Sequence, residues 1–139
     1  MVLRHAYAFA ATEYILEKVR AFAASNEKKL LVVLFDPYKV TKSLIKDGTR
    51  YDQQVVDYLD ENNYNYFDMN VVHAEDFKSF NLSVNDYFKR YFIGHYKPAG
   101  NHFFAFSIKD KIVNWLDPKP ITYQGERQNM EDFDGYLER

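Results

Sequence analysis

The chain has 139 residues, carries a formal net charge of -2 at pH 7 and contains no cysteine. This length fits one domain with a modest core, and the balanced charge predicts no nucleic-acid partner. The absence of cysteine excludes a disulfide scaffold, a thiol nucleophile and a thiolate metal site. A cysteine-free composition is compatible with the cytoplasm, where we expect the protein to reside.

Two further features of the composition bear on function. The apolar start, Met1 to Thr12, is short and is soon followed by Glu13 and Glu17, so we expect no signal peptide. No stretch approaches the length of a membrane span, and we predict no membrane association. The chain contains 12 Phe and 12 Tyr, a high share, which indicates that some aromatic side chains line a subunit contact or a pocket.

The first two predicted elements are a helix and a buried strand. Apolar residues from Ala8 to Ala24 recur at helical spacing, which predicts an amphipathic helix. Leu30 to Phe35 is an unbroken apolar run, typical of a parallel strand that is buried on both faces. Asp36 and Pro37 end this strand, because proline cannot extend a hydrogen-bond ladder.

A second strand is predicted after an intervening helix. Residues 39–46 favour a short helix, and Asp47-Gly48 favours a turn. Thr49 is the predicted N-cap of a helix that runs to Glu61. The segment Tyr64 to Met69 then alternates enough to form a strand. Two strands joined by a helix form a right-handed crossover, which predicts parallel pairing.

The last third of the chain is predicted to be mostly helical. Residues 71–80 fit either a short helix or a loop, and Ser83 caps a helix that extends to Tyr91. A final helix begins at Pro98, and its apolar residues point in most directions, which predicts burial on more than one side. We therefore expect a single α/β domain over 1–120, with a small parallel sheet flanked by helices, and a polar tail or arm over 121–139.

A histidine loop stands out between the last two helices. Ligands of open parallel sheets bind beyond the carboxyl ends of the strands. Three segments are expected to meet there, namely residues 36–38, residues 69–73 and the loop that carries His95. Because an unperturbed imidazole titrates near neutral pH, His95 is the best-placed titratable residue in the chain.

The order of elements resembles the C-terminal half of the SGNH/GDSL hydrolases. His95, Pro98, Gly100 and Asn101 look like the closing block of that family, which carries its catalytic histidine. Residues 30–36 look like its fourth strand and residues 64–69 like its fifth. The resemblance spans roughly residues 8 to 117. It implies a flavodoxin-like three-layer architecture and a catalytic-base role for His95.

Three parts of the family's machinery are absent from this chain. The sequence contains no Gly-Asp-Ser nucleophile motif and no Gly-x-Asn segment for an oxyanion hole. Phe92 occupies the position, three residues before His95, where the family has an aspartate. Because a histidine without a nucleophile cannot run acyl transfer, the resemblance implies ancestry and fold more strongly than activity.

Two functions follow from this pattern. The first is a non-catalytic oligomerising or ligand-binding protein derived from a hydrolase fold, in which the cleft near His95 holds a small molecule. The alternative is an esterase or acetylhydrolase that uses His95 as general base. Its nucleophile would come from elsewhere, such as Ser83 or Ser107 of a dimer mate.

Simpler interpretations of the same residues remain open. His95 also fits a loop histidine that hydrogen-bonds a backbone carbonyl, and Asp36 fits a strand-end turn residue. The spacing of His73, His95 and His102 does not match a metal site, and we predict neither a metal nor a cofactor.

Two strands make a small sheet with both edges open. Exposed edges promote aggregation unless they are paired or covered, and the Leu30 to Phe35 strand is too apolar for an exposed edge. The simplest cover is a second copy of the chain. We therefore predict a homodimer or a higher homo-oligomer.

Overall fold

The computed structural model describes the backbone of residues 2–116 and the side chains of residues 6–116. It contains six α-helices, one π-helical turn and two strands. In chain order these are α1 (Val2–Ser25), β1 (Val32–Leu34), η1 (Pro37–Thr41), α2 (Lys42–Asp47), α3 (Gln53–Glu61), β2 (Tyr66–Asp68), α4 (Met69–Phe77), α5 (Val84–Tyr91) and α6 (Pro98–Leu116). The predicted tail at 121–139 lies outside the described residues.

The two strands form the predicted parallel sheet. β1 pairs with β2 in the register Val32–Tyr66, Val33–Phe67 and Leu34–Asp68. The predicted α/β class with a small parallel sheet is therefore confirmed. The predicted burial of the first strand on both faces is wrong, because Val33 is 41% exposed. Within the part of the chain that the structure describes, no helix covers the Val33 side chain closely enough to bury it.

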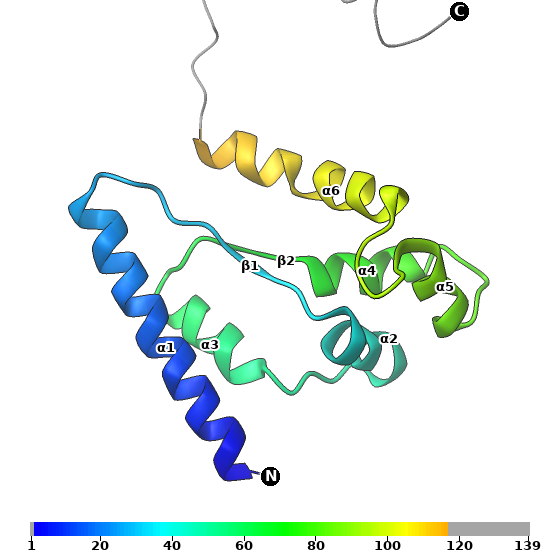
Figure 1. Cartoon of the computed structure of the whole chain (residues 1–139), viewed down its shortest axis with the longest axis horizontal. Helices are drawn as coiled ribbons and strands as arrows, with labels where there is room; N and C mark the ends of the chain where they lie inside the picture. The colour runs from blue at the N-terminus through cyan, green and yellow to red at the C-terminus, as the bar shows by residue number, and fades with distance from the viewer. Residues whose placement is uncertain (1, 117–139) are drawn as a thin grey trace, which may run out of the picture.

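The helices surround the strands unevenly (Figure 1). α1 lies beside α3 on one side of the strands, and α6 lies on the other side. α2, α4 and α5 gather beyond the carboxyl ends of the strands. Phe104 of α6 lies near Phe35, just after β1, and Trp115 lies near Lys29, just before it. α6 therefore runs antiparallel to the β1 segment.

Side-chain caps explain where several helices begin and end. The predicted cap at Ser83 is confirmed, because its hydroxyl oxygen accepts a hydrogen bond from the backbone N–H of Asp86. The predicted cap at Thr49 is wrong. Thr49 donates its backbone N–H and its hydroxyl to the side chain of Asp47, and α3 begins four residues later. Gly48 has φ 72° and ends α2, as the predicted turn requires.

The core is built from aromatic rings. Its centre is formed by Tyr87, Phe88, Tyr91 and Phe92, all on or just after α5. Phe35, just after β1, stacks on Tyr96 with ring centroids 5.0 Å apart. Aromatic pairs in these geometries add to the free energy that burial alone provides. The core therefore lies at the carboxyl end of the sheet, under α5 and the loop after it.

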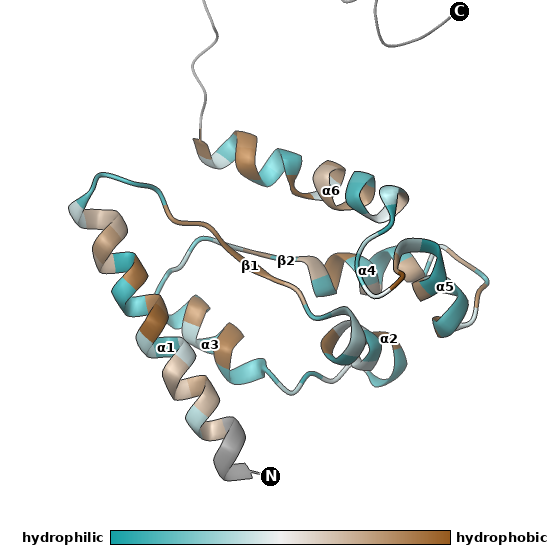
Figure 2. Cartoon of the chain, in the orientation of Figure 1, coloured by the Kyte–Doolittle hydropathy of each residue, from teal (hydrophilic) through white to brown (hydrophobic). Residues whose placement is uncertain are grey.

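α6 is less buried than its sequence predicts. Ile108 is the one large side chain of this helix that is buried, whereas Phe106 is 66% exposed. The predicted burial on more than one side is therefore wrong within the described residues. Figure 2 shows that hydrophobic residues recur along both α1 and α6. Over residues 2–116, no helix combines the length and apolarity that crossing a bilayer requires.

Gly100 is a packing point between α6 and the core. A Cβ at this position would collide with the ring of Tyr96 and lie 2.6 Å from the carbonyl oxygen of Tyr91. We expect Gly100→Ala to lower the free energy of unfolding by about 1–3 kcal/mol, because backbone must move to admit the methyl group. Urea unfolding measures this, with Asn101→Ala at an exposed position of the same helix as control. Equal losses in both variants would contradict the packing role.

Candidate functional site

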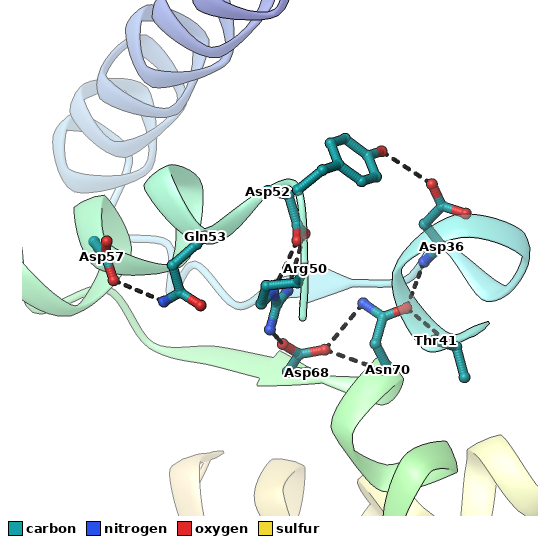
Figure 3. A network of polar contacts seen from close by, with 9 residues as sticks. Asp36, Thr41, Arg50, Asp52, Gln53, Asp57, Asp68 and Asn70 are labelled. Carbon is teal, nitrogen blue, oxygen red and sulfur yellow. Dashed lines mark hydrogen bonds and ion pairs between the residues drawn. The ribbon is translucent and has the colours of Figure 1, made fainter. Parts of the chain in front are cut away.

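The carboxyl ends of the two strands are joined by one buried amide (Figure 3). The Oδ1 atom of Asn70 accepts hydrogen bonds from the backbone N–H of Asp36, at 2.7 Å, and from the hydroxyl of Thr41, at 2.9 Å. Its Nδ2 atom donates to Asp68 Oδ1 at 3.0 Å. Asn70 and Thr41 are almost fully buried. Each polar group here has a partner within the protein, as burial demands.

A buried charge cluster lies beside this amide. The guanidinium of Arg50 donates two hydrogen bonds to the carboxylate of Asp52, at 2.7 and 2.9 Å, and one to Asp68. The three side chains are 7%, 15% and 9% exposed. Burial alone would lower the pKa of Arg50. The hydrogen bonds that Arg50 donates to Asp52 and Asp68, together with the negative charges of these carboxylates, outweigh burial and raise that pKa above its usual value.

The side chain of Asp36 accepts hydrogen bonds from two residues that follow it in the chain. Its Oδ1 atom accepts the backbone N–H of Lys39 at 3.0 Å, which caps the π-helical turn, and its Oδ2 atom accepts the hydroxyl of Tyr51 at 3.0 Å. Partial burial and this hydrogen bond raise the pKa of Tyr51 to about 12. The interpretation of Asp36 as a strand-end turn residue is confirmed.

A second polar chain runs through the aromatic core. His73 on α4 is fully buried, with its Nε2 atom 2.7 Å from the hydroxyl of Tyr96 and its Nδ1 atom 2.8 Å from the hydroxyl of Tyr87. The hydroxyls of Tyr87 and Tyr91 donate to Asp76 Oδ2 at 2.9 and 3.0 Å.

These contacts fix the direction of each hydrogen bond. The hydroxyl proton of Tyr87 faces two groups that only accept, Asp76 Oδ2 and the carbonyl oxygen of His73 at 3.1 Å, so the Tyr87 oxygen accepts the Nδ1–H of His73. The Nε2 atom of His73 then accepts the proton of Tyr96. Burial lowers the pKa of His73 to about 4, and Asp76 offsets part of that effect. His73 is therefore neutral at pH 7, with both ring nitrogens occupied.

The predicted convergence of three segments occurs, but His95 does not point into it. The Tyr38 hydroxyl accepts the backbone N–H of Gly94 at 3.1 Å, and His73 reaches Tyr96. His95 itself is exposed, and its Nδ1 atom lies 2.9 Å from the carbonyl oxygen of Tyr96. Within residues 6–116, no hydrogen bond or ion pair joins this ring to Asp36 or Asn70. Its geometry matches the loop-histidine interpretation.

The two serines considered as nucleophiles are engaged locally. Ser83 donates its hydroxyl to Asp86 Oδ2 at 2.7 Å while it caps α5. Ser107 donates its hydroxyl to the carbonyl of Phe103 at 2.8 Å on α6. Neither hydroxyl has a histidine as its hydrogen-bond partner in these contacts.

Sequence reasoning missed His73 as the centre of a buried network. The sequence fits either a helix or a loop over residues 71–80, and the structure has a helix there, α4. Met69, His73 and Phe77 follow one another at intervals of four residues, which places them on one face of α4. This four-residue spacing is the sequence pattern that places His73 on the same helix face as two apolar residues. Among the side chains that the structure describes, no three His, Asp or Glu residues form a metal-binding group.

Two hollows on the surface lie away from His95. One has a volume of about 230 Å³ and is lined by residues that include Arg20, Lys29 and Trp115. The other has a volume of about 570 Å³ and lies between α2 and α4. Arg20 and Lys29 already donate to the backbone carbonyls of Asn62 and Trp115. The expected ligand cleft at His95 is not among these two hollows.

Comparison with known proteins finds no matching family model, no matching curated protein and no matching solved structure.

Proposed function

We propose that this chain is a non-catalytic protein that acts by associating with copies of itself. The observation that carries the proposal is the exposure of α1. This helix packs along one side on α3 and carries large apolar side chains on the side that faces away from α3. Tyr7 is 79% exposed and Phe22 is 67% exposed. Contiguous apolar patches of this kind mark interaction surfaces.

The state of the polar residues also favours a non-catalytic role. α/β proteins place their ligands at the carboxyl end of the sheet. In this chain the carboxylate of Asp68 accepts hydrogen bonds there from both Arg50 and Asn70. His73 is neutral and buried. These side chains contribute to the stability of the fold, and a substrate would have to break their hydrogen bonds to reach them.

Descent from an SGNH-type hydrolase is part of the proposal. It is supported by the order of elements and by the block of His95, Pro98, Gly100 and Asn101. Phe92, in the place of the family's aspartate, is 6% exposed and stacks on Tyr96 with centroids 4.6 Å apart. A position that served catalysis in such an ancestor now contributes to the core. The lack of cysteine supports a cytoplasmic location.

Two assays on the full-length chain test this function. Light scattering at micromolar concentration is expected to give a mass of two or more chains. Hydrolysis of a chromogenic acetyl ester is expected to equal the blank for the wild type and for His95→Ala. Ester turnover that His95→Ala abolishes would support the hydrolase alternative, and a stable monomer would contradict self-association.

A further inference from the structure

One side of α1 presents a stripe of apolar side chains without a partner among the described residues. Helical geometry places residues 7, 11, 14, 15, 18 and 22 within an arc of about 100°. Tyr7, Tyr14, Ile15 and Phe22 on this stripe are 79%, 59%, 58% and 67% exposed. We call these six positions the α1 stripe.

The opposite side of α1 carries most of its charge and binds α3. Glu13 accepts the side-chain amide of Gln54, and Arg20 donates to the carbonyl of Asn62. Lys18 is the one charged residue of the α1 stripe, and its ammonium lies 5.0 Å from the ring centroid of Tyr14. The stripe is therefore almost entirely apolar.

The order of residues along the α1 stripe is symmetric about its midpoint. When two copies of the helix run antiparallel with residue 14 opposite residue 15, Tyr7 lies opposite Phe22 of the second copy. The small Ala11 then lies opposite the long Lys18. A two-fold interface requires this reciprocity, in which residue i meets residue j and j meets i. Ala11, the one small residue of the α1 stripe, leaves room for the long Lys18 side chain opposite it.

We propose that α1 packs antiparallel on α1 of a second copy, about a two-fold axis between Tyr14 and Ile15. This inference rests on the proposed self-association and identifies its surface. The antiparallel direction follows from Lys18. A parallel pair would place the two ammonium groups opposite each other, whereas the antiparallel pair separates them by about 10 Å along the helix axis, at 1.5 Å per residue.

The available area fits a second copy. An aromatic side chain carries about 150–250 Å² of surface. Taken with their exposed fractions, Tyr7, Tyr14 and Phe22, together with Ile15 and the neighbouring Val19, supply on the order of 500 Å² on each protomer. A specific interface at the lower end of the stable range buries about 600 Å² per partner. The α1 stripe with its immediate flanks therefore supplies most of what a small dimer interface needs.

The first test uses two isoleucines of matched exposure. Ile15 on the α1 stripe is 58% exposed, and Ile93 in the loop after α5 is 62% exposed. We expect Ile15→Asp to sediment as a monomer and Ile93→Asp to retain the wild-type mass. A wild-type monomer would refute self-association itself. A wild-type dimer that Ile15→Asp leaves intact would refute the α1 stripe alone.

The second test uses the absence of cysteine, which removes any background of disulfide formation. Under mild oxidation, full-length Ile15→Cys is expected to form a disulfide with its own copy, because residue 15 lies beside the axis. Phe22→Cys is not expected to do so, since its two copies would lie about 22 Å apart along the axis. A mixture of Tyr7→Cys and Phe22→Cys chains is expected to cross-link.

The cross-linking results distinguish an antiparallel α1 pair from a parallel pair and from contact with another surface. Self-cross-linking of Phe22→Cys would indicate a parallel pair and overturn the proposal. Loss of the dimer in Ile15→Asp without any cross-link at positions 7, 15 and 22 would show that α1 meets a different surface, which also overturns it. Glu61→Cys, exposed on α3 outside the stripe, serves as the control that should not cross-link.

Discussion

Replacing Arg50 by alanine is expected to lower the free energy of unfolding by about 3–5 kcal/mol. The side chains of Asp52 and Asp68 are 15% and 9% exposed in the wild type, and the substitution removes the cation that both of them share. An unpaired charge in such surroundings is costly, because water can replace few of the lost hydrogen bonds. Asp68 also caps α4, so the loss extends from the start of α3 to the sheet and α4.

Arg90→Ala is the matched control. Arg90 is exposed on α5, and its guanidinium lies 5.0 Å from the ring centroid of Phe80. Removing that contact should cost less than about 1 kcal/mol. Urea unfolding at pH 7 of wild type, Arg50→Ala and Arg90→Ala measures both changes. Equal losses would contradict the role of Arg50 as the partner of two buried carboxylates.

The free energy of unfolding is expected to fall by about 3 kcal/mol between pH 6.5 and pH 4 because of His73 alone. Its pKa is about 4 in the folded protein and 6.5 in the unfolded chain. Within that window the unfolded chain binds a proton that the folded protein does not, so lowering the pH favours unfolding. Below pH 4 both states bind the proton and this contribution stops changing.

His73→Gln separates this effect from other titrations. The variant keeps a polar side chain among Tyr87, Tyr96 and the aromatic rings, but cannot titrate. Carboxylates titrate in both proteins, so the difference between their pH profiles isolates His73. Urea unfolding at pH 7.5 and pH 4.5 should give a smaller loss in His73→Gln than in wild type. The exposed His95→Gln should follow the wild type, and identical profiles for all three proteins would contradict the burial argument.

Much of the secondary structure follows from local patterns in the sequence. Helical spacing predicts α1, and the Ser83 cap predicts the start of α5. The connection between the two strands predicts their parallel pairing. Each of these depends on residues that are close together in the chain, where backbone geometry and side-chain caps decide the outcome.

Burial is harder to predict, because it depends on which surfaces meet. The sequence marks Phe106 and Val33 as apolar, but not whether another element covers them, and both are exposed. The sequence likewise draws attention to His95, which follows Gly94 and comes three residues before Pro98, while His73 occupies the centre of the polar core. A histidine within an apolar helical face gives a weaker signal than one on a loop.

Two local interactions compete for Thr49, a capping box with Asp52 and hydrogen bonds to Asp47, and the sequence pattern does not show which one forms. Threonine three residues before an aspartate fits a capping box, yet the nearby Asp47 binds both its N–H and its hydroxyl. Asp52 in turn is held by Arg50. The charge cluster around Arg50 therefore determines how this segment enters α3.

Sedimentation velocity of the full-length wild-type chain, from low micromolar concentration upward, tests self-association most directly. A dimer or a larger assembly is expected, with dissociation only on dilution. A species with the mass of one chain over the whole concentration range would contradict the proposed function.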